Sequence, residues 1–195
     1  MVHIREILTI VCLIIVCLAA VVFIIKTRMA CRDMLREDNL YELAFKDNLT
    51  GLFNRTAYNR YTRELEVTKH GQIWIMLFDI DEFKTINDTQ GHLAGDRVLC
   101  SAADLLNRVF AMHGHKIYRI GGDEFAVIAR NTDEEQVVSM LLQLGDFEKT
   151  MHSFRFSKGY ARVDRGSNGG FERAFFDADK MLYADKESRK HQVEL

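Results

Sequence analysis

The fold is decided by residues 116–129, which read KIYRIGGDEFAVIA. Two apolar runs, Lys116–Ile120 and Phe125–Ala129, are typical of β-strands, and a segment of two glycines and two acids separates them. Glycine accepts the positive φ that tight turns require, so we expect a hairpin with positive-φ glycines in its turn. Such a turn presents the carboxylates of Asp123 and Glu124 at its tip.

A second group of acids follows another predicted strand. Residues 73–78 are almost wholly apolar, and Asp79 and Asp81 come after them. An acid at the end of a strand is, taken alone, most often a solvated surface residue. Carboxylates from two chain segments, both at strand ends, are however the hard oxygen ligands that Mg²⁺ takes beside phosphate and water. The combination indicates metal-dependent phosphoryl or nucleotidyl transfer.

Helix and strand patterns alternate through the rest of the chain. Helices are predicted over residues 55–67, 94–110, 132–144 and 171–187, and one more strand over residues 154–161. Asn54 is placed to cap the first helix, and Thr132 and Glu135 have the spacing of a capping box for the third. The core order is strand, helix, hairpin, helix, strand. It predicts an α/β (α+β) domain with a ferredoxin-like βαββαβ antiparallel sheet and flanking helices.

The N-terminal region is expected to anchor the chain. Residues 7–25 contain no charged side chain, and as a helix rising about 1.5 Å per residue they match the thickness of a bilayer's hydrocarbon core. A buried helix or a cleaved signal peptide is also apolar, but this run is longer than a signal peptide needs and lacks a polar cleavage region. Lys26, Arg28 and Arg32 follow the run, which places the C-terminal side in the cytoplasm.

We therefore expect three parts: a transmembrane anchor over residues 1–26, a helical stalk or linker over residues 27–46, and a globular domain over residues 47–195. The stalk shows no sustained heptad, so a dimerising helix and a plain solvated connector both stay open. The net charge is −2, with acids and bases interspersed, which argues against nucleic acid as a partner. The four cysteines show neither a CxxC pair nor zinc spacing.

Further polar groups surround the acids in the sequence. Lys84 and Asn87 follow Asp81 closely and offer a cation for phosphate and an amide for a base edge. The glycine-bracketed segment Gly91–Asp96 suits close approach of a ligand to the backbone. Cations near the C-terminus either reach phosphates or stabilise an ordinary helix end. These cations are Lys186, Arg189 and Lys190.

Four separated segments are recognisable together. They are Asp47–Arg55 (DNLTGLFNR), Phe78–Asp88 (FDIDEFKTIND), Gly121–Phe125 (GGDEF) and Ala178–Lys186 (ADKMLYADK). In order and spacing they resemble the GGDEF-domain family of diguanylate cyclases, and the resemblance covers roughly Asp47 to His191. It implies a cyclase-palm fold and the condensation of two GTP molecules into cyclic di-GMP with release of pyrophosphate.

The resemblance also implies a metal site and a catalytic pair. Two Mg²⁺ ions per site are expected, with Mn²⁺ as an alternative ion. Asp79, the Ile80 carbonyl, Asp123 and Glu124 match the metal-binding positions. Asp123 matches the position of the general base, and Glu124 is the second acid of the catalytic pair.

The substrate-binding positions are implied in the same way. Asn87 and Asp96 match the guanine-reading positions, His92 matches a further substrate contact, and Lys84, Lys186 and Lys190 match or adjoin the phosphate-binding positions. A carboxylate at Asp96 accepts from the guanine N1 and N2 hydrogens, which adenine lacks, so it selects GTP. Each protomer is expected to hold one GTP, which makes a homodimer necessary for the reaction.

The chain departs from the family pattern at three places. Arg189-Lys190-His191 stand where the family usually has Gly-Arg-Asn, and Lys158 stands where an aliphatic residue is usual. We expect the Lys158 side chain either to face solvent or to point at the nucleotide. Met112 and His115 occupy the arginine and aspartate positions of the RxxD product-inhibition motif, so that site is expected to be absent.

The sequence therefore predicts a diguanylate cyclase anchored by a single span in the inner (cytoplasmic) membrane of a bacterium, with its catalytic domain in the cytoplasm. The alternative is a degenerate GGDEF module that binds GTP or cyclic di-GMP as a sensor without turnover. The intact acids at positions 79, 123 and 124 favour the enzyme, because a sensor does not need a complete metal set.

Overall fold

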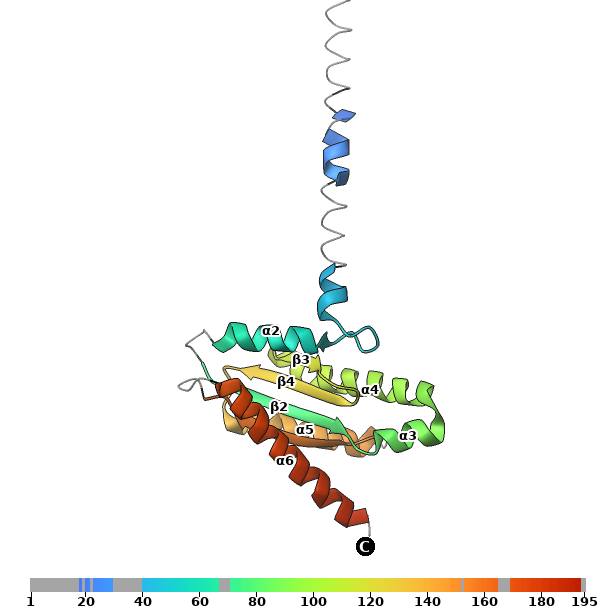
Figure 1. Cartoon of the computed structure of the whole chain (residues 1–195), viewed down its shortest axis with the longest axis vertical. Coiled ribbons are helices and arrows are strands. Elements are labelled where there is room, and N and C mark those ends of the chain that lie inside the picture. Colours follow the sequence, from blue (N-terminus) through green and yellow to red (C-terminus); the bar gives the residue numbers. More distant parts are fainter. Residues whose placement is uncertain are drawn as a thin grey trace, which may run out of the picture. The chain divides into compact units, whose positions relative to one another are not determined.

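The structure of the protein, a computed structural model, describes residues 18, 20–21, 23–29, 40–66, 71–151, 153–164 and 169–193 (Figure 1). Its contacts divide the chain into two compact units, residues 1–43 and 44–195. Among the described residues, no helix is long and apolar enough to cross a membrane. Most of the predicted span, residues 7–25, lies outside them. The membrane anchor therefore stays a prediction.

The second unit holds the named elements. In chain order they are β1 (Phe53–Asn54), α2 (Arg55–Glu66), β2 (Ile73–Ile80), α3 (Phe83–Gln90), α4 (His92–Phe110), the short 3₁₀ helix η1 (Ala111–His113), β3 (Lys116–Arg119), β4 (Glu124–Arg130), α5 (Glu134–Met151), β5 (Phe156–Arg162) and α6 (Gly170–Val193). Each strand and helix predicted for residues 47–195 has a counterpart among them. The sequence did not predict β1 or α3.

The five strands form one sheet in the order β1-β3-β4-β2-β5. β1 pairs with β3 in parallel, and the other three neighbouring pairs are antiparallel. The hairpin strand β4 lies between β2 and β3, which are joined by the helices α3 and α4. This is the split βαβ arrangement of a βαββαβ fold, so the predicted fold class of the domain is confirmed. β5 forms one edge of the sheet.

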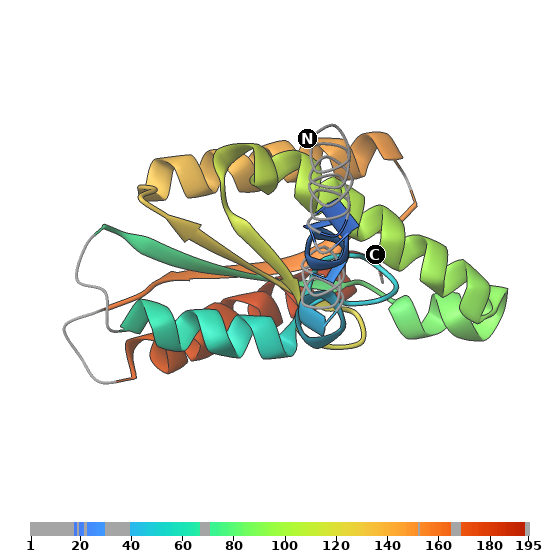
Figure 2. The ribbon, with the colours of Figure 1, turned by 90° about the horizontal axis from the view of Figure 1, so that it is seen from above.

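Helices cover both faces of the sheet, α4 and α5 on one and α2 and α6 on the other (Figure 2). Side chains of β2 alternate between them: Met76 and Phe78 pack in the core under α4 and α5, whereas Ile75 and Leu77 pack in the core under α2 and α6. Because side chains of a strand alternate with period two, Asp79 belongs to the α6 face.

Of the two predicted helix caps, that of α2 is confirmed and that of α5 is not. The Asn54 side chain accepts from the Ala57 backbone N–H at 3.0 Å, which confirms the cap of α2. The predicted capping box of α5 was wrong by one residue. Asp133 and Gln136 exchange the reciprocal bonds, at 2.8 and 3.1 Å, instead of Thr132 and Glu135. Thr132 turns back to the Arg130 carbonyl.

The hairpin between β3 and β4 exists, but its glycines serve a different purpose from the predicted one. Neither Gly121 nor Gly122 has a positive φ. A Cβ at Gly121 would instead collide with the Glu124 carboxylate, whereas one at Gly122 would meet nothing within 4 Å. Gly121 is therefore needed for the room it leaves to the side chain of Glu124.

Candidate active site

Two carboxylates face each other across the centre of the sheet. Asp79 near the end of β2 is the direct ladder partner of Glu124 at the start of β4. Side chains directly opposite in an antiparallel pair have Cβ atoms about 5 Å apart, and like charges in such a pair destabilise the sheet. An arrangement that weakens the fold in this way is suited to holding a cation between the two strands.

Asp123 adds a third carboxylate beside this pair. Its backbone carbonyl accepts from the Ile80 N–H at 3.3 Å, which ties the turn to the end of β2. Burial and the negative charge of Asp79 raise the pKa of Asp123. Burial and the charges of Asp123 and Asp79 likewise raise the pKa of Glu124, against a lowering effect of Arg55. Both shifts have the direction expected where carboxylates repel one another.

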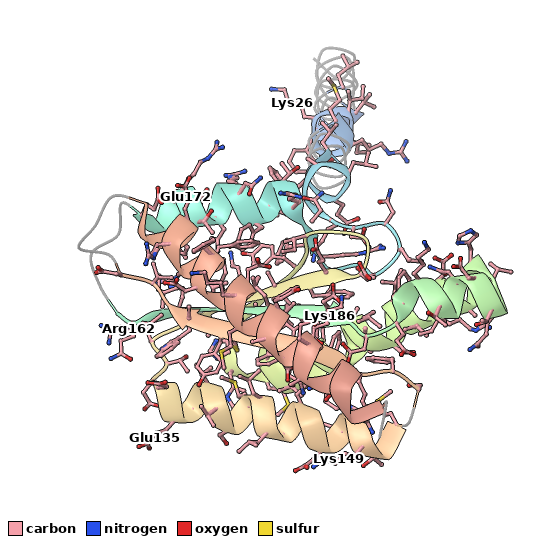
Figure 3. The ribbon with its side chains drawn as sticks, turned by 60° about the horizontal axis from the view of Figure 1, so that its bottom comes forward. Lys26, Glu135, Lys149, Arg162, Glu172 and Lys186 are labelled. Atoms are coloured by element: carbon pink, nitrogen blue, oxygen red, sulfur yellow. The ribbon has the colours of Figure 1, made fainter. Side chains whose placement is uncertain are left out.

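Lys186 of α6 reaches into this group of acids. Its Nζ lies 2.6 Å from Asp79 Oδ1, with the side chains 35% and 14% exposed. Figure 3 shows Lys186 on the side of α6 that lies over the sheet. Close packing fixes that position, because a Cβ at Gly159 in β5 would collide with the backbone of Ala178 and Leu182 in α6.

Arg119, which the sequence analysis did not single out, fixes the turn that carries Asp123 and Glu124. Its guanidinium donates to the Gly122 carbonyl at 2.7 and 3.2 Å and to Asp47 Oδ1 at 3.0 Å. Burial acts to raise the pKa of Asp47, but hydrogen bonds from Thr50 and the ion pair with Arg119 outweigh it and lower that pKa. The segment at which the domain begins is thus bonded to the acidic turn through one arginine.

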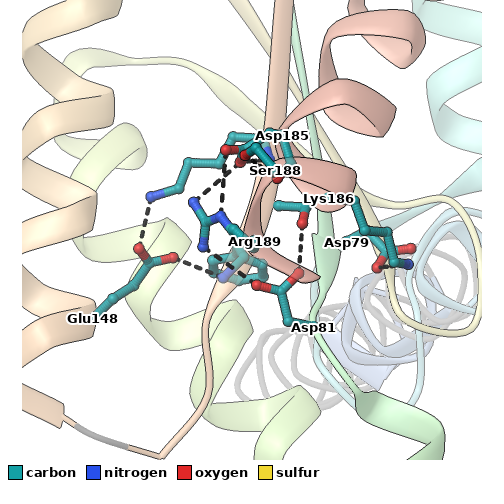
Figure 4. Close-up of polar contacts among 10 residues, drawn as sticks. Asp79, Asp81, Glu148, Asp185, Lys186, Ser188 and Arg189 are labelled. Atoms are coloured by element: carbon teal, nitrogen blue, oxygen red, sulfur yellow. Dashed lines mark hydrogen bonds and ion pairs between the residues drawn. The ribbon is translucent and has the colours of Figure 1, made fainter. Parts of the chain in front are cut away.

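Asp81 has a different environment from Asp79. Its carboxylate accepts from the Ser157 hydroxyl in β5, and its other oxygen lies 3.3 Å from Arg189 in α6 (Figure 4). Arg189 also contacts Asp185 at 3.1 and 3.3 Å. The sequence left Arg189 open as a phosphate contact or a helix-end cation, and the structure shows it paired with two carboxylates. Lys190 lies in α6, and its side chain is outside the described part.

Lys158 neither faces solvent nor lies on the face of the sheet that carries Asp79, since it pairs with Phe78 in the ladder, so both alternatives predicted for it were wrong. Its Nζ forms an ion pair with Glu148 of α5 at 2.6 Å, and the two side chains are 14% and 6% exposed. The other Glu148 oxygen accepts from the Phe156 N–H at 2.9 Å. A lysine at an aliphatic position is therefore explained by a buried acid on the facing helix.

The predicted guanine-reading residues lie on the helix pair α3–α4. The Asn87 side chain packs on Gly95, where a Cβ would collide with its amide oxygen. Asp96, the next residue of α4, is exposed, as are His92 and Lys84. Gly91 between the helices has a φ of 81°, a left-handed conformation that favours glycine. The structure thus brings Asn87 close to the segment that carries Asp96.

The acids fit a divalent cation of the Mg²⁺ type. Asp79 faces Glu124 across the ladder, and burial and neighbouring acids raise the pKa of Asp123 and of Glu124, so a cation with oxygen preference would stabilise this group. Within the described residues, no three Asp, Glu, His or Cys side chains are grouped so that they could hold a metal ion by themselves. Mg²⁺ does not require such a grouping, since it usually keeps several waters and binds through one or two carboxylates plus substrate phosphates.

Comparison with known proteins identifies the family of this domain. The family model described as the diguanylate cyclase GGDEF domain matches residues 44–192. The chain belongs to the GGDEF-domain diguanylate cyclase family. The Gly121–Phe125 segment from which the family takes its name is the turn that Arg119 holds, and the family match begins where the second compact unit begins.

Relatives of this GGDEF chain include membrane proteins and crystallised cyclases. It is 34% identical over 161 residues to the probable diguanylate cyclase DgcI of Escherichia coli K12, covering 83% of this chain and 35% of that protein. It is 32% identical over 170 residues to an uncharacterized membrane protein of Staphylococcus aureus USA300, covering 80% and 47%. The chain therefore spans between about a third and a half of the length of these relatives.

Solved structures support the same family fold. The coiled coil and GGDEF domain of DgcB from Caulobacter crescentus, in complex with c-di-GMP, superposes with a TM-score of 0.74 at 27% identity, covering 84% of this chain and 93% of that one. The diguanylate cyclase SiaD from Pseudomonas aeruginosa, in complex with its activator SiaC, gives a TM-score of 0.67 at 25% identity, covering 88% and 70%.

Proposed function

We propose that this protein is a diguanylate cyclase, which condenses two GTP molecules into cyclic di-GMP and releases two pyrophosphates. The observation that carries the proposal is the register of the sheet: Asp79 opposes Glu124, and Asp123 adjoins both. Opposed carboxylates weaken a sheet, so their presence favours a role in binding metal and phosphate. The resemblance of four segments to the family supports the same reading.

The side chains of this site have separate tasks in that reaction. Asp79, Asp123, Glu124 and the Ile80 carbonyl would hold the Mg²⁺ ions, which neutralise phosphate charge and favour the ionised 3′-hydroxyl. Asp123 accepts the proton of the 3′-hydroxyl. The 3′ oxygen then bonds to the α-phosphorus of the partner GTP, and the bond to pyrophosphate breaks. Lys84 and Lys186 bind the phosphates that leave.

Guanine recognition is assigned to the helix pair α3–α4. Asn87 supplies an amide, Asp96 supplies a carboxylate that accepts from guanine N1–H and N2–H, and His92 adds a contact at the start of α4. An adenine base would leave the Asp96 carboxylate unpaired, which disfavours ATP. Lys190 extends the phosphate contacts from the end of α6.

A homodimer is part of the proposal, because one protomer holds one GTP and each 3′-hydroxyl must attack the other nucleotide. We assign residues 1–26 to a transmembrane anchor in a bacterial cytoplasmic membrane, residues 27–46 to the stalk, and residues 47–195 to the catalytic domain on the cytoplasmic side. The apolar segment 7–25 supports the anchor, and a relative is named a membrane protein.

The test uses the full chain in lipid nanodiscs, incubated with GTP and Mg²⁺ and analysed by nucleotide chromatography. We expect cyclic di-GMP and pyrophosphate in a ratio of about one to two, from the atom balance of the reaction. Asp79→Ala should abolish product formation, and Arg173→Gln, on the exposed side of α6, should leave it unchanged. Binding of GTP or cyclic di-GMP without product would instead identify the sensor module, and binding of neither nucleotide would refute both.

A further inference from the structure

Arg189 is the residue of α6 that connects the helix to the loop after β2. Its NH1 lies 3.3 Å from Asp81 Oδ2, and the two side chains are 29% and 22% exposed. The family pattern has glycine at this position, which has no side chain for such a contact. The link between α6 and Asp81 is therefore a property of this chain's own sequence.

A second carboxylate, that of Asp185, also holds the guanidinium of Arg189. Asp185, four residues earlier in α6, accepts from Arg189 Nε at 3.3 Å and from its NH2 at 3.1 Å. Asp185 also accepts from the Lys158 N–H at 2.9 Å, on the open side of the edge strand β5. The arginine thus rests on a carboxylate that is itself bonded to the sheet (Figure 4).

Asp81 connects the loop that joins β2 to α3 with the chain around β5. Its N–H donates to the Arg155 carbonyl at 2.9 Å, and its carboxylate accepts from the buried Ser157. The next residue, Glu82, has a φ of 56° although it is not glycine. A left-handed non-glycine residue costs free energy and persists only where its surroundings hold it. In this loop the surroundings are the contacts of Asp81 on one side of Glu82 and, on the other, the bond from the Ile86 N–H to the Glu82 carbonyl at 3.1 Å.

We propose that Arg189 is a positioning residue of the nucleotide site, which through Asp81 holds residues 80–84 in the conformation that binds metal and phosphate. The inference rests on the proposed function, since the Ile80 carbonyl and Lys84 flank the loop and are assigned there to metal and phosphate. Arg189 touches neither group. It acts by keeping the strained backbone at Glu82 from relaxing between them.

Hydrogen exchange of the full chain without nucleotide tests the structural half of this proposal. Arg189→Gln should speed exchange of the backbone amides of Asp81 and Ile86, which donate to the Arg155 and Glu82 carbonyls, about fivefold, the scale of a partly exposed charged contact. Arg173→Gln is the matched control, because Arg173 also lies on α6 and pairs with Asp177 four residues away, but its pair is exposed and makes no link to the loop. Equal exchange in both variants would overturn the proposal.

The pairing itself is tested by a double-mutant cycle. In an Asp81→Asn background, Arg189→Gln should add little further exchange, since both changes remove one contact. Arg189→Lys keeps the charge and should restore part of the protection. Additive effects of the two changes would show that Arg189 acts through another partner and would overturn the inference. Melting curves identify any variant that fails to fold, and Arg189→Lys then carries the test.

Kinetics separates this inference from the proposed function. Arg189→Gln should raise the KM for GTP about fivefold and change kcat less, because the residue orders a binding loop and not the reacting atoms. A general loss of folded protein would lower the apparent kcat with KM unchanged. If the unaltered chain makes no cyclic di-GMP, the proposed function fails, whereas the exchange result still decides the role of Arg189.

Discussion

The ion pair between Lys158 and Glu148 gives the sharpest test of how this domain is held together. Its side chains are 14% and 6% exposed, so neither charge is well solvated once the other is removed. Breaking a buried pair on one side costs about 3–5 kcal/mol, whereas replacing both partners by neutral groups of similar size is close to neutral. For a domain of about 150 residues, each kcal/mol lowers Tm by roughly 2–4 °C.

We therefore expect Lys158→Met and Glu148→Gln each to lower Tm by about 10 °C or more. The double variant should return close to the original Tm. Glutamine keeps the acceptor that the Phe156 N–H uses at 2.9 Å, so the edge strand stays bonded in that variant.

Differential scanning calorimetry of the three variants decides the question, with Lys149→Met as the control. Lys149 forms a pair with Asp146 on the same helix, but its side chains are 75% and 76% exposed, and such pairs contribute little. A double variant that loses as much Tm as the two single variants together would refute the reasoning, because additive losses would show that the two charges are not coupled.

We expect Glu124→Gln to abolish cyclic di-GMP synthesis and yet to raise the Tm of the nucleotide-free protein. The Tm should rise because one of the two opposed carboxylates, Asp79 and Glu124, loses its charge, and a lower Tm would contradict this. Arg119→Gln should reduce kcat/KM about tenfold by releasing the Gly122 carbonyl, as measured by initial rates beside Arg173→Gln. Added cyclic di-GMP should not inhibit the enzyme at low micromolar levels, because neither residue at the motif positions can bind it as arginine and aspartate would. Met112 is an exposed thioether, and burial and then the nearby His113 lower the pKa of His115, which keeps its imidazole neutral. Strong non-competitive inhibition in a product titration would argue against this prediction. The rate per protomer should rise with protein density in the membrane, and a constant rate from a monomer would exclude the dimer requirement.

Local sequence signals predicted most of the fold because they are properties of neighbouring residues. Short apolar runs placed the strands, and Asn54 marked the start of α2. The capping box of α5 was misplaced by one residue, because Thr132 and Asp133 both carry capping oxygens and only the backbone path selects between them. α3 was missed, since its eight residues have no buried side chain and so no apolar stripe.

The acids were found from the sequence, but most of their partners were not. Asp79, Asp123 and Glu124 lie in short recognisable segments. Arg119, by contrast, is an ordinary basic residue until the fold brings it to Asp47, 72 positions away. Lys158 was misread for the same reason, because Glu148 lies on another element and nothing local to either residue shows that both are buried. Contacts between elements depend on packing, which no local pattern encodes.

The charges around β2 follow from how one helix crosses one strand. Lys186 and Arg189 are three residues apart in α6 and therefore lie on one face of the helix. Asp79 and Asp81 are two residues apart in an extended segment and therefore point to one side. The spacing of the cations is about 5 Å along the helix, and that of the acids is about 7 Å along the strand. The two match closely enough for Lys186 to pair with Asp79 while Arg189 pairs with Asp81. Gly159 in β5 allows α6 to pack this close to the sheet, because any side chain there would collide with the backbone of α6. Both pairs thus depend on a single helix position, so α6 holds β2 and the loop after it in one arrangement.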